Sequence, residues 1–179
     1  MFDLSKCSAL RLDASTQILP FDCGDPDLNE FLLQDALGYA ENLLAVTNIF
    51  EFGGRTAAFY CVLNDKITVT DFGSRRAYRR FLNAVPDGKQ HSSVPAVKIG
   101  RLGVDTALQG RGVGTQILDH IKVSFTTRNK TGCRFVTVDA YNNSATITFY
   151  ARNGFRFMAE DECLQKTRLM CFDLMTFIR

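Results

Sequence analysis

Two spacings of apolar residues divide the chain into predicted strands and helices. Alternating or continuous apolar runs predict strands at residues 7–19 (a first strand and its connection), 48–52, 56–63, 66–71, 97–104, 134–140, 155–158 and 169–174. Apolar residues three and four positions apart predict helices at about 27–44, 74–83, 112–126 and 143–153. Gly53-Gly54 and Asn64-Asp65 predict turns between strands, and the last two strands form a closing hairpin. This order predicts one mixed sheet covered by helices.

Capping residues mark the ends of two predicted helices. Asp25 or Asp27 can cap the first helix, with Pro26 in its first turn. Glu30 completes a capping box if Asp27 is the cap. Gly154 follows the last predicted helix and suits the left-handed conformation in which helices often end.

A glycine-rich loop joins the predicted strand 97–104 to the next helix. Gly110, Gly112 and Gly114 occupy alternate positions there. Glycine has no Cβ to hold a ligand off the backbone, and a helix N-terminus offers unpaired N–H donors. The loop therefore predicts a pyrophosphate site. A P-loop would need lysine after Gly114, and a dinucleotide fingerprint would need glycine in place of Thr115, so neither motif is present.

Two motifs resemble those of the GNAT N-acetyltransferases. Q-x-x-G-x-G spans Gln109 to Gly114, and N-x-x-A-x-x-x-Y-x-x-x-G-F spans Asn143 to Phe155, with Thr146 where alanine is usual. The resemblance implies an α/β (α+β) GNAT fold, with a central mixed, mostly antiparallel sheet flanked by helices and splayed at the acetyl-CoA site. The length of 179 residues predicts a single domain over residues 1–179.

The same resemblance implies acetyl-CoA as the cofactor and assigns roles to the site. Backbone N–H groups near Leu102–Val104 would bind the thioester oxygen, and Tyr150 would protonate the CoA sulfur as general acid. The alternative for Tyr150 is a packed aromatic ring with a satisfied hydroxyl. The residues implied to bind acetyl-CoA are Leu102, Gly103, Val104, Gln109, Gly110, Arg111, Gly112, Val113, Gly114, Thr115, Asn143 and Tyr150.

A narrower resemblance points to one branch of the family. Phe21-Asp-Cys-Gly before a leucine-rich helix, and Arg101-Leu-Gly-Val-Asp before the glycine loop, are similar to the acetyltransferase toxins of bacterial toxin–antitoxin pairs. Gly103 replaces the commoner alanine, and Asn48-Ile-Phe is an imperfect version of the usual strand. The branch implies aminoacyl-tRNA as acceptor and a small ribbon-helix-helix antitoxin as partner.

The central strand lacks the carboxylate base of many GNAT enzymes. No Asp or Glu precedes Asp105 in the predicted strand 97–104. A lysine amine, with a pKa of about 10.4, is almost fully protonated at neutral pH and needs a base. An α-amine, with a pKa of about 7.7–8.0, is already partly neutral. The missing base therefore favours an α-amine acceptor, in accord with aminoacyl-tRNA.

The positive charges are unevenly distributed, although the net charge is only +2. The first basic group comprises Arg75, Arg76, Arg79 and Arg80, with Lys89 nearby. The second comprises Lys122, Arg128, Lys130 and Arg134. Both groups could be solvated faces or could bind a phosphate-rich partner such as RNA. Arg101 could likewise hold a phosphate or form a structural ion pair.

The remaining composition indicates the cellular compartment and the kinds of site to expect. Six cysteines without C-x-x-C spacing and no signal peptide predict reduced thiols and a cytoplasmic location. No apolar run is long enough for a membrane span, and the isolated His91 and His120 predict no metal site. A homodimer is allowed. Three functions stay open: a tRNA-acetylating toxin, a general small-molecule or protein N-acetyltransferase, and a non-catalytic CoA-binding module. Tyr150 and the intact glycine loop argue against the third.

Overall fold

The chain forms two compact units in a computed structural model that describes residues 2–86, 91–127, 131–159 and 165–178. The first unit comprises Met1–Leu63 and Ile99–Val123, and the second comprises Asn64–Lys98 and Ser124–Arg179. A single domain over 1–179 stays a prediction. Lys89, Arg128 and Lys130 of the two basic groups lie outside the described residues.

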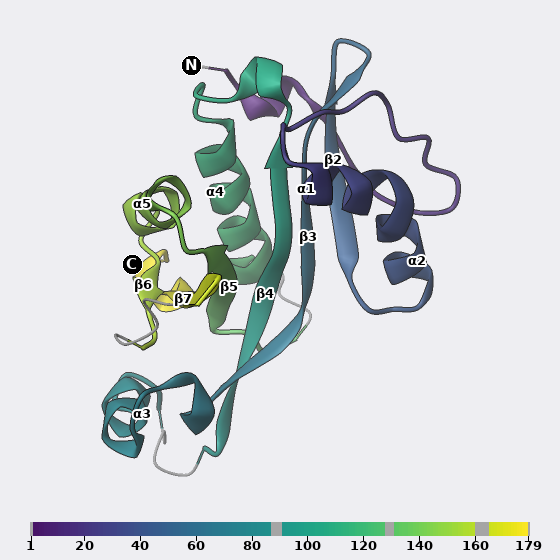
Figure 1. Ribbon diagram of the computed structural model, residues 1–179. Helices are drawn as coiled ribbons and strands as arrows, with labels where there is room; N and C mark the ends of the chain where they lie inside the picture. Colours follow the sequence, from purple (N-terminus) through teal and green to yellow (C-terminus); the bar gives the residue numbers. More distant parts are fainter. Residues whose placement is uncertain (1, 87–90, 128–130, 160–164, 179) are drawn as a thin grey trace. The chain divides into compact units, whose positions relative to one another are not determined.

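Seven strands are hydrogen-bonded in the order β1-β2-β3-β4-β5-β7-β6 (Figure 1). Their bounds are β1 Ser8–Arg11, β2 Val46–Phe52, β3 Arg55–Thr68, β4 Ser93–Val104, β5 Phe135–Tyr141, β6 Arg156–Phe157 and β7 Thr167–Asp173. The pairs β1–β2, β2–β3, β5–β7 and β6–β7 are antiparallel. The helices are α1 Pro26–Glu30, α2 Ala36–Glu41, α3 Arg75–Leu82, α4 Val113–Thr126 and α5 Ser144–Arg152. The predicted mixed sheet flanked by helices is confirmed, while its splay at the acetyl-CoA site stays a prediction.

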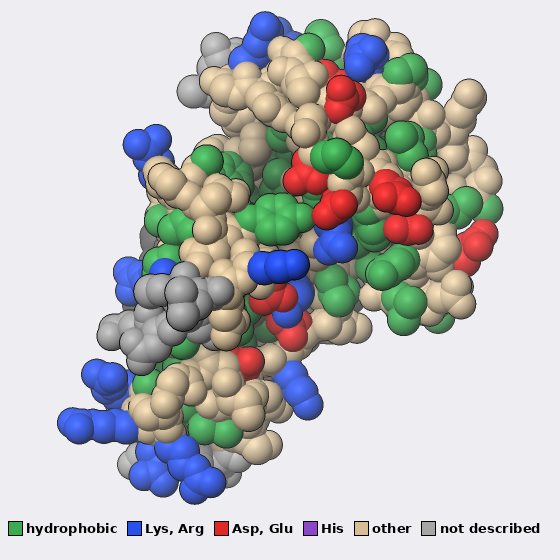
Figure 2. Space-filling view, in the orientation of Figure 1, with side chains coloured by type: hydrophobic (Ala, Val, Ile, Leu, Met, Phe, Trp, Pro, Cys, Tyr) green, Lys and Arg blue, Asp and Glu red, His purple; other side chains and the backbone are tan. Residues whose placement is uncertain are grey.

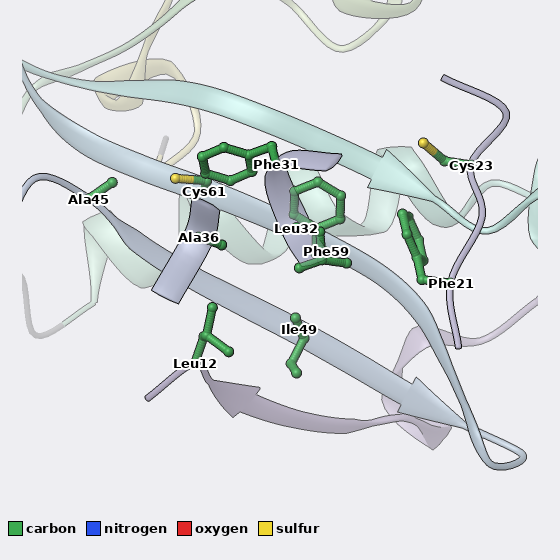
Figure 3. Close-up of a cluster of buried hydrophobic side chains, with 10 residues drawn as sticks. All are labelled: Leu12, Phe21, Cys23, Phe31, Leu32, Ala36, Ala45, Ile49, Phe59 and Cys61. Carbon is green, nitrogen blue, oxygen red and sulfur yellow. The ribbon is translucent and has the colours of Figure 1, made fainter. Parts of the chain in front are cut away.

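Helices cover both faces of the strands in the first unit because successive side chains of a strand point to opposite faces. On one face, Ile49 and Phe59 pack beneath the helical segment that carries Phe31 (Figure 3). On the other face, the rings of Phe50 and Tyr60 lie 5.4 and 6.0 Å from the ring of His120 in α4. Burial on both faces explains why residues 56–62 of β3 are continuously buried.

The second unit has its own core. Tyr78 and Leu82 of α3 pack with Ile67 of β3, Ala96 of β4 and Phe135 of β5. The buried side chains of α3 are spaced one helical turn apart, so its arginines are left on the outer side.

The first predicted helix differs from its expected form in three ways. Asp25 is the N-cap, accepting hydrogen bonds from the N–H groups of Asp27 and Leu28 at 3.0 and 3.2 Å, so the capping box with Glu30 is wrong. A π-helical turn, Phe31–Asp35, separates α1 from α2. The helix ends at Glu41 rather than near residue 44. A π turn adds one residue to the helical repeat, which changes the residues that face the core.

The predicted turn at Asn64-Asp65 is wrong, because β3 continues to Thr68. The Oδ2 atom of Asp65 accepts a hydrogen bond from Thr137 Oγ1 at 2.5 Å and lies 3.8 Å from Lys98 Nζ. These contacts satisfy the carboxylate within an extended strand and outweigh the local turn preference. The turn at Gly53-Gly54 is confirmed, with φ values of +59° and +74°.

Among the described residues, no helix is long and apolar enough to cross a membrane. In the same residues, no group of three or more His, Cys, Asp or Glu side chains could hold a metal ion. Five cysteines are free, and Cys163 lies outside the described part of the chain.

Candidate active site

The glycine-rich loop has the backbone conformation of an anion-binding loop. Gly110 and Gly112 have φ values of +70° and +82°, in the left-handed region that favours glycine. The helix α4 begins directly afterwards, at Val113. No residue in the described part of the chain accepts a hydrogen bond from the backbone N–H groups of residues 110–115. These donors at a helix N-terminus fit the pyrophosphate of acetyl-CoA.

Gln109 holds the start of this loop. Its Nε2 atom donates to the backbone oxygens of Cys23 and Val104, at 2.8 and 3.0 Å. Both hydrogens of the side-chain amide are therefore used within the protein. Gln109 positions the loop, and its predicted contact with acetyl-CoA stays a prediction.

Asp105 fixes the turn between β4 and the loop. Its side chain is 4% exposed, and its Oδ2 atom accepts a hydrogen bond from Arg55 Nη2 at 3.0 Å. Its Oδ1 atom accepts one from the N–H group of Ala107 at 3.0 Å. Burial raises the pKa of the Asp105 carboxyl, but the Ala107 and Arg55 hydrogen bonds outweigh burial and hold the pKa below its usual value. Asp105 is therefore an anchored carboxylate rather than a general base.

The toxin-like segment Phe21–Gly24 lies against the same loop. The N–H group of Thr106 donates to the backbone oxygen of Asp22 at 2.9 Å, and Gln109 reaches Cys23 as described above. The short motif and the glycine loop, which are far apart in sequence, thus form one hydrogen-bonded assembly.

Gly103 leaves no room for a larger residue. A Cβ atom there would lie 2.6 Å from Phe59 Cε1 and 3.1 Å from Phe21 Cζ. Phe59 is fully buried and its ring lies 5.4 Å from that of Phe21. The glycine that replaces the commoner alanine is therefore explained by two aromatic rings packed against the strand.

The strand β4 is irregular between Gly100 and Gly103. A Cβ atom at Gly100 would lie 2.9 Å from Leu63 Cδ2, and one at Gly103 would contact Phe59. Leu63 and Phe59 are four residues apart in β3 and so share a face. Positions three apart in a regular strand point to opposite faces, so β4 contains an extra residue here, as in a β-bulge. A bulge leaves backbone groups unpaired, which fits the predicted binding of the thioester oxygen near Leu102–Val104.

Arg101 lies at this irregularity and is exposed. Its Cζ atom lies 5.2 Å from the ring centroid of Phe31, and its Nη1 atom donates to the backbone oxygen of Gly100 at 2.8 Å. None of the ion pairs found among the described residues involves Arg101. The alternative of a structural ion pair for this residue therefore has no support within the described part of the chain.

Tyr150 in α5 is 6% exposed and packs between aromatic rings. Its ring centroid lies 5.0 Å from that of Phe149 and 5.2 Å from that of Phe155. Burial raises the pKa of the Tyr150 hydroxyl above its usual value, which keeps the phenol protonated. No described residue forms a hydrogen bond with this hydroxyl, so the alternative of a satisfied structural hydroxyl has no support within that part of the chain.

Asn143 has a structural role that the sequence did not predict. It is the N-cap of α5, and its Oδ1 atom accepts a hydrogen bond from the N–H group of Thr146 at 2.9 Å. Its predicted contact with acetyl-CoA stays a prediction. At the other end of α5, Gly154 has a φ of +86°, which confirms its expected position after the helix.

The four arginines of the first basic group lie together on α3. Arg75, Arg76, Arg79 and Arg80 are all exposed, and no ion pair in the described part of the chain involves them. Lys and Arg side chains gather over α3 in Figure 2. A helix surface with four exposed guanidinium groups that no described carboxylate neutralises suits a polyanion.

The described members of the second basic group, Lys122 and Arg134, do not form a positively charged surface. Lys122 is buried, and its Nζ atom lies 3.0 Å from Asp119 Oδ1. Helical spacing explains this burial, because Lys122 follows Leu118 by four residues and so lies on the apolar side of α4. Arg134 donates to both carboxylate oxygens of Asp173, at 2.8 and 3.1 Å.

Two contacts around the site had no signal in the sequence. The Gln116 side chain accepts a hydrogen bond from the N–H group of Leu4 at 2.8 Å and donates to the backbone oxygen of Phe2 at 2.7 Å. The N–H group of Phe2 also donates to the backbone oxygen of Arg111 in the glycine loop, at 3.2 Å. The N-terminal segment is thus attached to the loop and to α4 by residues more than one hundred positions away.

Comparisons with known proteins agree with this geometry. The curated tRNA-acetylating toxin of Mycobacterium tuberculosis is 27% identical over 154 residues, which cover 84% of this chain and 85% of the toxin. AtaT complexed with acetyl-methionyl-tRNAfMet has a similar fold, with a TM-score of 0.71 and 21% identity over 96% of this chain and 98% of AtaT. A Tyr-to-Phe variant of the AtaT toxin, bound to the C-terminus of the antitoxin AtaR and to acetyl-CoA, has a TM-score of 0.71 and 19% identity, over 96% and 95% of the two chains.

The family match rests on more than half of the sequence. Residues 56–157, from the second residue of β3 through the glycine loop and Tyr150 to the end of β6, match the acetyltransferase (GNAT) domain. The chain therefore belongs to the GNAT acetyltransferase family, whose members use acetyl-CoA to acetylate an acceptor.

Proposed function

We propose that this acetyltransferase is a toxin that acetylates the α-amino group of an aminoacyl-tRNA. The observation that carries the proposal is a GNAT site without a carboxylate base in β4. The chain also exposes four arginines on α3 that form no ion pair with any described residue. The similarity to a tRNA-acetylating toxin and to AtaT bound to acetyl-methionyl-tRNAfMet supports the same acceptor. The proposed location is the cytoplasm, where aminoacyl-tRNA is found.

The acceptor class follows from proton chemistry. Asp105 is the carboxylate that directly follows β4. It accepts hydrogen bonds from Arg55 and from the N–H group of Ala107, and these bonds keep the carboxyl ionised and engage both of its oxygens. An acceptor with a pKa near that of an α-amine presents enough neutral amine at pH 7 to react without a base. A lysine side chain would be protonated there and would react slowly.

The reaction then needs a group that polarises the thioester carbonyl and an acid that protonates the departing thiolate. The amine nitrogen attacks the thioester carbonyl carbon, and backbone N–H groups near Leu102–Val104 stabilise the oxygen that becomes negative. The carbon–sulfur bond breaks, and the Tyr150 hydroxyl gives its proton to the departing thiolate. The raised pKa of Tyr150 supports this role, because the phenol stays protonated until the thiolate forms.

An antitoxin partner is part of the proposal. The AtaT toxin has been solved with the C-terminus of its antitoxin AtaR, and this chain shares that fold. We expect a small ribbon-helix-helix protein, encoded next to this chain, to suppress its activity.

Acetylation of purified aminoacyl-tRNA with labelled acetyl-CoA tests the proposal. Tyr150→Phe should lower the turnover rate by about 10²–10⁴-fold, the range that general acid catalysis contributes. Tyr60→Phe is the matched control, because Tyr60 is also buried and burial raises its pKa to about 12. The control should keep full activity, and both variants should bind acetyl-CoA in calorimetry. Expression of the parent alone should arrest growth, and the Tyr150 variant should not.

Acetylation of peptides or free amines, with none on aminoacyl-tRNA, would replace this proposal by a general N-acetyltransferase. Turnover of the Tyr150 variant within a few-fold of the parent would leave the acceptor unchanged but require another proton donor.

A further inference from the structure

Within the described part of the chain, Arg101 has unused hydrogen-bond donors next to the segment proposed to bind the thioester oxygen. A guanidinium carries five N–H donors, and one contact, from Nη1 to the Gly100 oxygen at 2.8 Å, accounts for the only hydrogen bond that Arg101 makes to described residues. No carboxylate in that part of the chain neutralises it. An exposed arginine with unused, fork-shaped donors is suited to bind an anion with two oxygens.

The guanidinium is held in place before any ligand binds. Its Cζ atom lies 5.2 Å from the centroid of the Phe31 ring. Phe31 is buried and contacts two further rings, with centroid distances of 5.4 Å to Tyr39 and 6.3 Å to Phe59. The ring is thus fixed by the core, and the hydrogen bond to Gly100 fixes the other end of the guanidinium. A positioned arginine loses less conformational freedom on binding than a mobile surface arginine does.

The position of Arg101 in β4 decides which anion it can reach. It directly precedes Leu102, the first residue of the segment proposed to bind the thioester oxygen, and it lies at the irregularity between Gly100 and Gly103. The arginines of α3 belong to another element and sit on a helix surface. Arg101 is therefore suited to a single anion close to the reacting amine.

We propose that Arg101 is a specificity-determining residue that binds the phosphate of the 3′-terminal nucleotide of the acceptor. This inference rests on the proposed aminoacyl-tRNA activity. In such an acceptor, one ribose separates the aminoacyl ester from the nearest phosphate, so that phosphate is the anion closest to the reacting amine. Arg101 would then select amines attached to a nucleotide over free amino acids and peptides.

Two minimal acceptors that differ by one phosphate test this inference. The first is 3′-O-aminoacyl-adenosine, and the second is the same ester carrying a 5′-monophosphate. The parent should acetylate the phosphorylated ester with a kcat/KM at least about tenfold higher, as expected for a charge-assisted hydrogen bond. Arg101→Gln should abolish this preference and leave the rate on the unphosphorylated ester within about twofold. Arg101→Lys should keep part of it, since a lysine retains the charge but loses the fork.

Two controls separate phosphate binding at Arg101 from a general charge effect and from cofactor binding. Arg11→Gln removes an exposed strand arginine in β1 and should keep the full preference. The KM for acetyl-CoA should be unchanged in Arg101→Gln, whereas a rise would show that Arg101 binds a phosphate of CoA and would overturn the inference.

Further outcomes would also overturn it. These are a parent that acetylates both esters equally, a preference that survives in Arg101→Gln, and an equal loss on both esters, which would show a structural role. Acetylation of aminoacyl-tRNA with neither ester accepted would overturn it as well, because recognition would then lie beyond the terminal nucleotide. A parent inactive on aminoacyl-tRNA itself would instead reject the proposed function on which the inference rests.

Discussion

Replacing Gly103 by alanine should destabilise the first unit through steric overlap with two aromatic rings. The new Cβ atom would lie 2.6 Å from Phe59 Cε1 and 3.1 Å from Phe21 Cζ, whereas carbon atoms in contact are usually about 3.5–4.0 Å apart. Phe59 is completely buried and packs against Phe21 and Phe31, so its ring cannot move away without displacing both. The backbone at Gly103 is not left-handed, and alanine therefore adds no backbone strain.

The expected magnitude is the difference between two terms. Overpacking of a filled core costs about 1–3 kcal/mol. Alanine in a strand interior recovers roughly 0.5–1 kcal/mol of backbone entropy relative to glycine. The net loss should be about 0.5–2 kcal/mol, which corresponds to a fall in Tm of roughly 2–6 °C for a chain of this size.

Thermal and urea unfolding of Gly103→Ala and Gly100→Ala should separate the steric cost from a general glycine effect. A Cβ atom at Gly100 would meet Leu63 Cδ2 at 2.9 Å, but that atom is the end of a flexible side chain and can move. Gly100→Ala should therefore be neutral or slightly stabilising. Phe59→Leu makes space beside residue 103 and should rescue part of the Gly103→Ala loss in a double-mutant cycle, with a coupling of about 0.5 kcal/mol or more. Equal Tm values for Gly103→Ala and Gly100→Ala, with no coupling to Phe59, would refute the steric argument.

Two further predictions concern ligands. Gly112→Asp introduces a carboxylate beside the predicted pyrophosphate at a φ of +82° and should abolish most acetyl-CoA binding in calorimetry, whereas Gly73→Asp, at an open position, should bind normally. Unchanged affinity in Gly112→Asp would reject the assignment of the loop. Reversing Arg79 and Arg80 to glutamate should weaken acetylation of aminoacyl-tRNA and reduce the slope of log rate against log salt by about one unit per lost phosphate contact, with acetyl-CoA affinity intact. Equal rates at every salt concentration would show that α3 does not contact RNA.

Local sequence determined the elements that carry the catalytic motifs. The helices α3, α4 and α5 begin and end within one or two residues of their predicted bounds, because their caps, apolar spacing and terminal glycines are local signals. The glycine loop could be identified for the same reason, since its φ values above +60° require glycine at fixed positions.

The tertiary structure alone decided which partners these elements would have. Asn64-Asp65 has turn residues, yet β3 continues because Thr137 and Lys98 satisfy the Asp65 carboxylate. Lys122 belongs to a basic run of the sequence, but the apolar side of α4 buries it beside Asp119. A residue's charge and local propensity are properties of the chain, whereas its burial and its partners depend on segments that are distant in sequence.

The same distinction applies to the residues of the candidate site. The motif residues Gly112 and Tyr150 could be named because two sequence motifs resemble those of the GNAT family. The sequence could not show that both amide hydrogens of Gln109 bond to Cys23 and Val104, or that no described carboxylate pairs with Arg101. Whether a side chain keeps unused donors depends on the fold, because a donor bonds to the acceptors that the fold places within about 3 Å of it. Those acceptors come from segments that are distant in sequence.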